Sequence, residues 1–178
     1  MSVSLRRATT SAALVTAGAL VSVAALATSA WAVSPSTATA SYNCGTWGSG
    51  TATLTATDSG GVKKIKLTST SITMPAGSSA NPNSITTTLK VKKTAGGVTS
   101  EVQFSGTVNP GMSGGNPITL GPIALSSGTL AAGNTSDSWV LAGAPSASNW
   151  SLRIVTSSPT AATVYCTATG AQSSVFTW

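Results

Sequence analysis

Polar and hydrophobic residues alternate with a period of two along most of the chain after Pro35. Thr alternates with Ala and Leu in residues 51–57, and Lys alternates with Ile and Leu in residues 64–67. This alternation is typical of β-strands that bury one face and expose the other. It predicts two strands, joined by a turn at Asp58-Ser59-Gly60-Gly61.

The most regular alternation predicts a β-hairpin in the middle of the chain, with strands at residues 85–92 and 98–108. Glycine supplies the positive φ that a tight hairpin turn needs, so Gly96-Gly97 marks the turn. A loop of Gly96-Gly97 sets Glu101 opposite Lys92, whereas a loop of Ala95-Gly96 sets it opposite Lys90. Both registers align the apolar faces. The residues expected to face inward are Ile85, Thr87, Leu89 and Val91 in the first strand and Val98, Val102, Phe104 and Val108 in the second.

Nine or ten short strands, with no helical pattern after residue 32, predict an all-β domain. The architecture we expect is a single immunoglobulin-like β-sandwich or a Greek-key barrel. Pro, Gly, Asn and Ser are frequent in residues 75–83 and 109–117, which we interpret as loops. Further strands are predicted at residues 118–125, 138–141, 150–156, 162–169 and 174–178.

The N-terminal pattern is that of a cleavable signal peptide covering residues 1–32. Arg6 and Arg7 precede an apolar run at residues 12–27, and Ser29-Ala30-Trp31-Ala32 places small residues at the two positions that a signal peptidase inspects. The alternative is a membrane anchor, but this run is shorter than the ~20 apolar residues that cross a bilayer. We therefore expect a secreted, extracellular chain with no membrane span after cleavage.

Two cysteines lie far apart in the expected mature chain, which divides into a linker at residues 33–40 and a β domain at residues 41–178. An exported chain with only Cys44 and Cys166 is expected to join them in one disulfide. We interpret this bond as a clasp between the first strand and a late strand.

Catalytic and metal-binding side chains are scarce, because charged residues make up 7% of the chain and histidine is absent. Residues 111–115 match Gly-x-Ser-x-Gly, but Ser113 has no histidine to take its proton. The carboxylates of Asp58, Glu101 and Asp137 are far apart in the sequence, unlike those of a glycosidase or a calcium site. We expect no catalytic residue, no metal site and no cofactor. A hydrolase with an unrecognised site is the third functional hypothesis.

Lysines are concentrated on two predicted strands, where Lys64, Lys66, Lys90 and Lys92 project outward. If these strands are neighbours, their lysines form a basic stripe that could bind an anionic wall polymer. The alternative interpretation is that the lysines keep exposed strands soluble and protect an edge from aggregation. We expect no sequence-specific binding of nucleic acid.

Aromatic side chains are the second candidate feature, because exposed Trp and Tyr rings cover the apolar faces of sugars. Trp47, in a glycine-rich turn, and Tyr165, on the face opposite Cys166, are the predicted surface rings. The alternative is that they pack against the disulfide. Trp150 shares its parity with Leu152 and Ile154, which predicts a core position.

Four features together resemble small secreted actinobacterial immunoglobulin-like β-sandwich proteins of unknown function. They are a Tyr-x-Cys at residues 42–44, threonine-rich strands, the Gly-Thr-Leu-Ala-Ala-Gly stretch at residues 128–133 and a cysteine near the C-terminus. The resemblance implies an immunoglobulin-like fold and no particular functional residue.

We therefore expect a non-catalytic domain that acts by surface contact at or beyond the cell envelope, as a structural, adhesive or glycan-binding module. The alternative is a binder of anionic cell-wall polymer through the lysine stripe. In either case the expected partner is a cell-wall polymer or a polysaccharide.

Overall fold

A computed structural model describes residues 32–178, which form twelve β-strands and one short 3-10 helix. The predicted signal peptide lies outside the described residues, apart from Ala32. The strands are β1 (Thr37–Asn43), β2 (Ser49–Ser59), β3 (Val62–Thr73), β4 (Ser79–Ala80), β5 (Ile85–Ala95), β6 (Val98–Thr107), β7 (Met112–Ser113), β8 (Pro117–Ser127), β9 (Thr135–Ser138), β10 (Leu152–Thr156), β11 (Ala162–Ala168) and β12 (Phe176–Thr177), and the helix is η1 (Gly45–Trp47).

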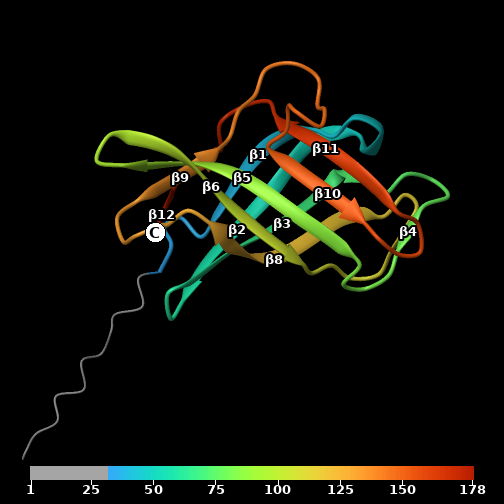
Figure 1. The fold of residues 1–178 in the computed structure, drawn as a ribbon, viewed down its shortest axis with the longest axis horizontal. Coiled ribbons are helices and arrows are strands. Elements are labelled where there is room, and N and C mark those ends of the chain that lie inside the picture. The colour runs from blue at the N-terminus through green and yellow to red at the C-terminus, as the bar shows by residue number, and fades with distance from the viewer. Residues whose placement is uncertain (1–31) are drawn as a thin grey trace, which may run out of the picture.

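Eight of the strands close into an antiparallel barrel in the order β10-β11-β1-β2-β3-β8-β6-β5 (Figure 1). Strand β5 closes the ring because residues 85–89 pair with β10, while residues 91–94 of the same edge pair with β9. The predicted all-β class is confirmed. The sheet forms a barrel rather than the two layers of a sandwich, because its first and last strands pair with each other.

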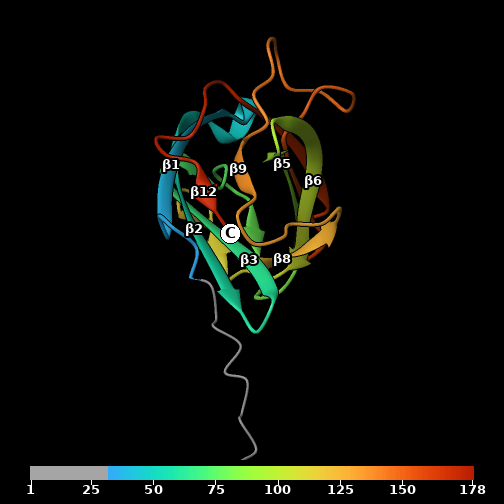
Figure 2. The same cartoon turned by 90° about the vertical axis from the view of Figure 1, so that its left-hand side faces the viewer.

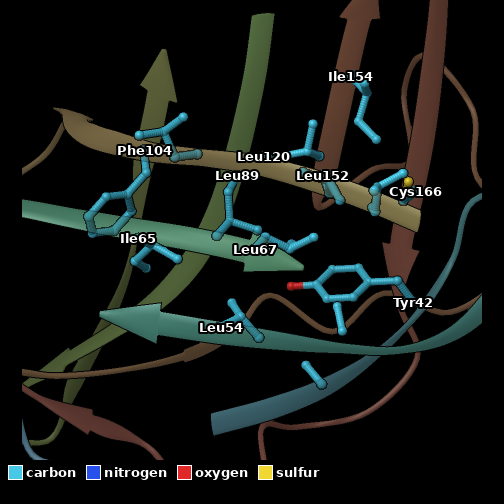
Figure 3. Packing of buried hydrophobic residues seen from close by; sticks show 14 of the residues in the cluster. Tyr42, Leu54, Ile65, Leu67, Leu89, Phe104, Leu120, Leu152, Ile154 and Cys166 are labelled. Atoms are coloured by element: carbon cyan, nitrogen blue, oxygen red, sulfur yellow. The ribbon is translucent and has the colours of Figure 1, made fainter. Parts of the chain in front are cut away.

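Alternating side chains from the barrel strands fill the interior (Figure 3). The inward face predicted for residues 85–91 is buried, as expected. Two valines predicted inward are exposed. Val98 is 71% exposed where the β5–β6 hairpin extends beyond the barrel (Figure 1), and Val108 is exposed because β6 ends at Thr107. Tyr42 points into the core, and burial raises the pKa of its hydroxyl to about 12.

The C-terminal segment closes one end of the barrel, where Figure 2 shows β9, β12 and the C-terminus within the ring of strands. Trp178 is buried there and stacks on Phe104 with ring centroids 5.6 Å apart. Its indole N–H donates a hydrogen bond to the hydroxyl of Ser136 over 2.8 Å. Strand β9 connects this C-terminal segment to the barrel wall, because it pairs with both β5 and β12.

Both predicted hairpins form, and each turns over two glycines. Gly96-Gly97 joins β5 to β6 and sets Lys92 opposite Glu101, which selects the first of the two registers. The β2–β3 turn is shorter than predicted, because only Gly60-Gly61 lies outside the strands. Asp58 is consequently a strand residue paired with Lys63 rather than part of the turn.

The remaining differences from the predicted elements are local. Strand β1 begins at Thr37, inside the segment at residues 33–40 that was expected to be a linker. The two predicted loops each contain a two-residue strand, β4 and β7, and these strands pair with each other. Strand β9 shares only Ser138 with the strand predicted at residues 138–141. Strand β10 begins two residues later than predicted, at Leu152. Trp150 therefore precedes β10 and is not its first residue.

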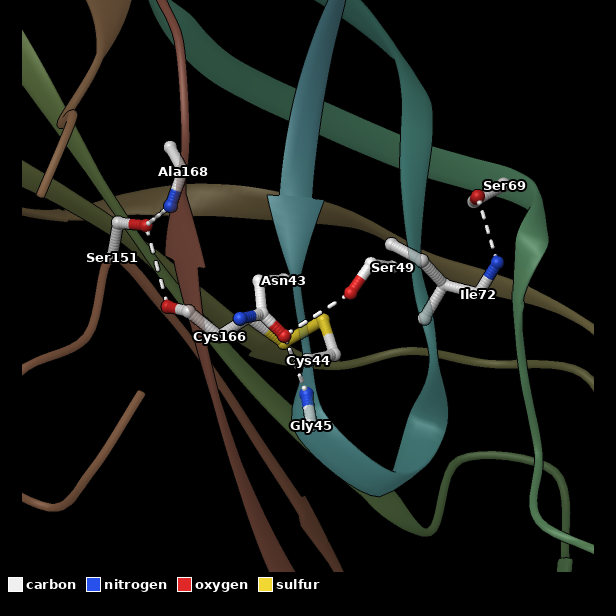
Figure 4. The surroundings of a disulfide bond; sticks show 9 residues. All are labelled: Asn43, Cys44, Gly45, Ser49, Ser69, Ile72, Ser151, Cys166 and Ala168. Carbon is white, nitrogen blue, oxygen red and sulfur yellow. Dashed lines mark hydrogen bonds between the residues drawn. A yellow bond between two sulfur atoms is a disulfide. The ribbon is translucent and has the colours of Figure 1, made fainter. Parts of the chain in front are cut away.

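The predicted disulfide between Cys44 and Cys166 is confirmed, with Cα atoms 4.1 Å apart (Figure 4). It joins the end of β1 to β11, next to the cross-strand pair of Asn43 and Thr167. Both cysteines are buried in the core. The bond is therefore a clasp between the first strand and a late strand, as the sequence suggested. Among the described residues, no helix has the length and hydrophobicity needed to cross a membrane.

Candidate ligand-binding surface

The lysine-bearing strands β3 and β5 are not neighbours, so this part of the prediction is wrong. Strands β8 and β6 lie between them in the sheet. With neighbouring strands about 4.8 Å apart, β3 and β5 are separated by about 14 Å. Lys64 and Lys66 are thus on one part of the barrel wall, and Lys90 and Lys92 are on another. No continuous stripe forms.

Carboxylates also offset part of the lysine charge. Lys90 Nζ lies 3.4 Å from Glu101, and Lys92 Nζ lies 3.6 Å from Asp137. Lys63 pairs with Asp58 at the closed end of the barrel. Each of the three acidic residues therefore contacts a different lysine, and the described chain brings no three of His, Cys, Asp and Glu together as a metal site.

Trp150 lies on the surface against two cations, and not in the core as its parity predicted. Lys90 Nζ is 4.3 Å from the centroid of its ring, and the guanidinium carbon of Arg153 is 5.2 Å from it. Strand β10 begins at Leu152, so Trp150 precedes its regular part. Ser151 and Leu152 are both fully buried, which breaks the alternation between Trp150 and the strand. Contacts at these distances are favourable cation–π interactions.

Tyr165 lies on this same outer face. Arg153 of β10 is directly opposite Tyr165 of β11, and on its other side it faces Thr88 of β5. Tyr165 is half-buried, so part of its side chain is exposed on this face. We call Lys90, Trp150, Arg153 and Tyr165 the aromatic–cation face.

Trp47, the other predicted surface ring, is not available for a ligand. It lies in η1, three residues after Cys44, and is only 5% exposed as part of the hydrophobic core. This corresponds to the alternative interpretation, in which the ring packs within the protein near the disulfide.

The aromatic–cation face presents hydrogen-bond donors beside ring surfaces. Arginine and lysine donate hydrogen bonds but accept none, so they match carboxylate, phosphate or sulfate oxygens. Glu101 is the carboxylate that contacts Lys90, whereas none of the ion pairs among residues 32–178 involves Arg153. The Nε atom of Arg153 is buried without a hydrogen-bond partner, so the donors that this face offers to an anion are the two terminal guanidinium nitrogens.

Sequence reasoning named Tyr165 but missed Trp150 and Arg153 as parts of one surface. The alternation of Arg153 between Leu152 and Ile154 was a usable signal, because it places the guanidinium outward.

The Gly-x-Ser-x-Gly motif at residues 111–115 is not part of the aromatic–cation face. Ser113 is exposed in β7, and its backbone N–H donates to Asn116 Oδ1 over 2.7 Å.

No protein-family model, no curated protein and no solved structure matches this chain.

Proposed function

We propose that this protein is an extracellular, non-catalytic binding module that holds an acidic polysaccharide of the cell envelope by surface contact. The observation that carries the proposal is the placement of the Trp150 indole against Lys90 and Arg153. Tyr165 extends the same surface onto the next strand. The proposal joins the glycan-binding and polyanion-binding hypotheses at one face, which shares only Lys90 with the predicted lysine stripe.

An acidic polysaccharide fits this face in two ways. Its carboxylate or phosphate groups can accept hydrogen bonds from the terminal nitrogens of the Arg153 guanidinium, which lies beside the Trp150 ring. The pyranose C–H groups can pack against the edges and exposed surfaces of the two rings. A charged ligand bound in this way should dissociate as salt concentration rises.

Export is part of this proposal. The predicted signal peptide at residues 1–32 would deliver the chain to an oxidising compartment, where a disulfide such as Cys44–Cys166 persists. A ligand of the envelope or the cell wall would be within reach there.

The test measures binding of the mature chain to polygalacturonate at low salt. We expect binding that falls at least tenfold in Arg153→Gln and Trp150→Ala, and that weakens between about 50 and 200 mM NaCl. Lys66→Gln is the matched control, because it also removes one outward-facing cation but lies on β3.

Retention that is equal in the wild type and in Arg153→Gln would contradict the proposal. So would loss of binding in Lys66→Gln alone, because it would indicate that β3 carries the site.

A further inference from the structure

A hollow of about 420 Å³ lies on the outer wall of the barrel over β2, β3 and β8. A break in the pairing of β3 with β8 accompanies it. Ser69 pairs with Ile118 and Thr73 pairs with Pro117, so three residues of β3 between them have no partner on β8. The residues that line the hollow are Thr51, Thr53, Thr68, Ser69, Thr70, Ser71, Pro117, Ile118 and Thr119.

A row of threonines in direct cross-strand register runs across this wall. Thr39 of β1 pairs with Thr53 of β2, which pairs with Thr68 of β3, and Thr68 pairs with Thr119 of β8. Neighbouring strands place these side chains about 4.8 Å apart. The row therefore presents hydroxyl and methyl groups at a regular spacing along the hollow.

Within the described chain, the hydroxyls of Thr53, Thr68 and Thr119 make no protein hydrogen bond, unlike those of some threonines elsewhere on the barrel. On β5 and β6, Thr86 bonds Thr107 over 2.9 Å, and Thr88 bonds Ser105 over 3.1 Å. Among the hydrogen bonds of residues 32–178, none involves the hydroxyl of Thr53, Thr68 or Thr119. These groups can both donate to and accept from a ligand.

The hollow contains no charged residue. An anion would find no cation within the lining, and a cation would find no carboxylate. Hydroxyls match a neutral partner that is itself rich in hydroxyls, and threonine methyl groups, with the ring of Pro117, supply apolar contact to its C–H groups.

We propose that the hollow on β2, β3 and β8 is a second binding site, which takes a neutral hexose oligosaccharide or a segment of an uncharged polysaccharide. It is independent of the aromatic–cation face, because β3 and β10 lie on opposite sides of the eight-strand ring. Two faces of different chemistry would let one molecule contact a charged and an uncharged polymer at the same time, with a gain in avidity.

The test is NMR titration of the ¹⁵N-labelled mature chain with cellohexaose, maltohexaose and chitohexaose at millimolar concentration. We expect shift changes at Thr53, Thr68 and Thr119 with at least one of these probes. The double variant T53V/T68V removes two hydroxyls with little change of shape, and it should bind about tenfold more weakly. T53S/T68S retains the hydroxyls and should retain most of the binding.

Thr57→Val is the matched control, because Thr57 is an exposed threonine of β2 that does not line the hollow. It should bind as the wild type does. Wild-type affinity in T53V/T68V would overturn the proposal, and so would the absence of shift changes at the hollow with all three probes. Shift changes confined to Trp150, Arg153 and Tyr165 would overturn it too, while leaving the proposed function intact.

Discussion

The Asp58–Lys63 ion pair is largely buried, and each charge is tolerated there because the opposite charge lies next to it. Both side chains are only 9% exposed, and Lys63 Nζ lies 5.8 Å from the centroid of the Trp178 ring. Loss of one partner leaves the other charge buried and uncompensated. We expect Asp58→Asn to lower the free energy of unfolding by about 3–5 kcal/mol, as measured by urea denaturation.

The double variant D58L/K63M separates this effect from a general need for polar residues. Replacing both charges by apolar groups of similar volume is often close to neutral, so the double variant should be more stable than Asp58→Asn alone. Lys66→Met, at an exposed position of the same strand, should change stability little. If the losses of stability in Asp58→Leu and Lys63→Met simply added up in the double variant, the two residues would not be coupled and the prediction would be contradicted.

Tyr42 makes stability depend on pH in the alkaline range. Burial raises the pKa of its hydroxyl to about 12, whereas an unfolded tyrosine ionises near 10. Between these values the unfolded chain releases the proton while the folded chain keeps it, so stability is complete below pH 10 and falls as pH rises.

The loss attributable to Tyr42 should reach about 2–3 kcal/mol by pH 12. Urea denaturation from pH 8 to pH 12 measures it. Tyr42→Phe removes the ionisable group, so its stability should fall less steeply than that of the wild type over the same range. Parallel curves for the two proteins would refute this assignment.

Individual side chains could be placed from the sequence only where strand alternation was unbroken. Leu89 and Val91 were predicted inward and are buried. Trp150 was misplaced because it precedes the regular part of β10. For Trp47, in a glycine-rich turn, the sequence left a surface position and packing near the disulfide both open, and the structure shows the buried position.

Among the elements, β8 depends on one glycine at the irregular part of its pairing with β3. Gly121 has φ +91°, and a Cβ atom there would come within 2.8 Å of the Ile65 carbonyl oxygen and of the Ile123 nitrogen. Both obstacles are backbone atoms, so neither can rotate away. Gly121→Ala should therefore destabilise the barrel by more than about 2 kcal/mol, measured as a lower denaturation midpoint.

Gly170→Ala is the control for this substitution. Gly170 lacks the positive φ, and no atom lies within 4 Å of its would-be Cβ. Its replacement should leave the midpoint nearly unchanged or raise it slightly. Equal stability of the two variants would show that β8 accommodates the side chain.

Sequence patterns identified most strands and both glycine hairpins, but not their order in the sheet. Alternation is a local property, whereas strand order depends on contacts between distant segments. Strand β8 returns to pair with β3, and this return separates the lysines of β3 from those of β5. The aromatic–cation face likewise depends on the pairing of β10 with β5, some 60 residues earlier in the chain.

For the molecule as a whole, the Cys44–Cys166 bond is the strongest constraint on the unfolded chain. It spans 122 residues, and in the chain-entropy model a loop of this length contributes about 5 kcal/mol. We expect C44A/C166A to lose a large part of this stability in urea denaturation. A loss below about 1 kcal/mol would indicate that strain in the native bond cancels the entropic gain.

The same bond determines how the molecule would respond to mechanical load. Tension applied to the segments on either side of the loop passes from β1 to β11 through the two sulfur atoms and bypasses residues 45–165 between them. The looped part of the barrel therefore cannot be drawn out as extended chain while the bond is intact. Reduction would release about 400 Å of additional length, at about 3.4 Å for each residue. A domain that holds a polymer under shear would thus extend only in the segments outside the disulfide loop. The residues of its two binding faces lie inside the loop, so the backbone there would not be under tension.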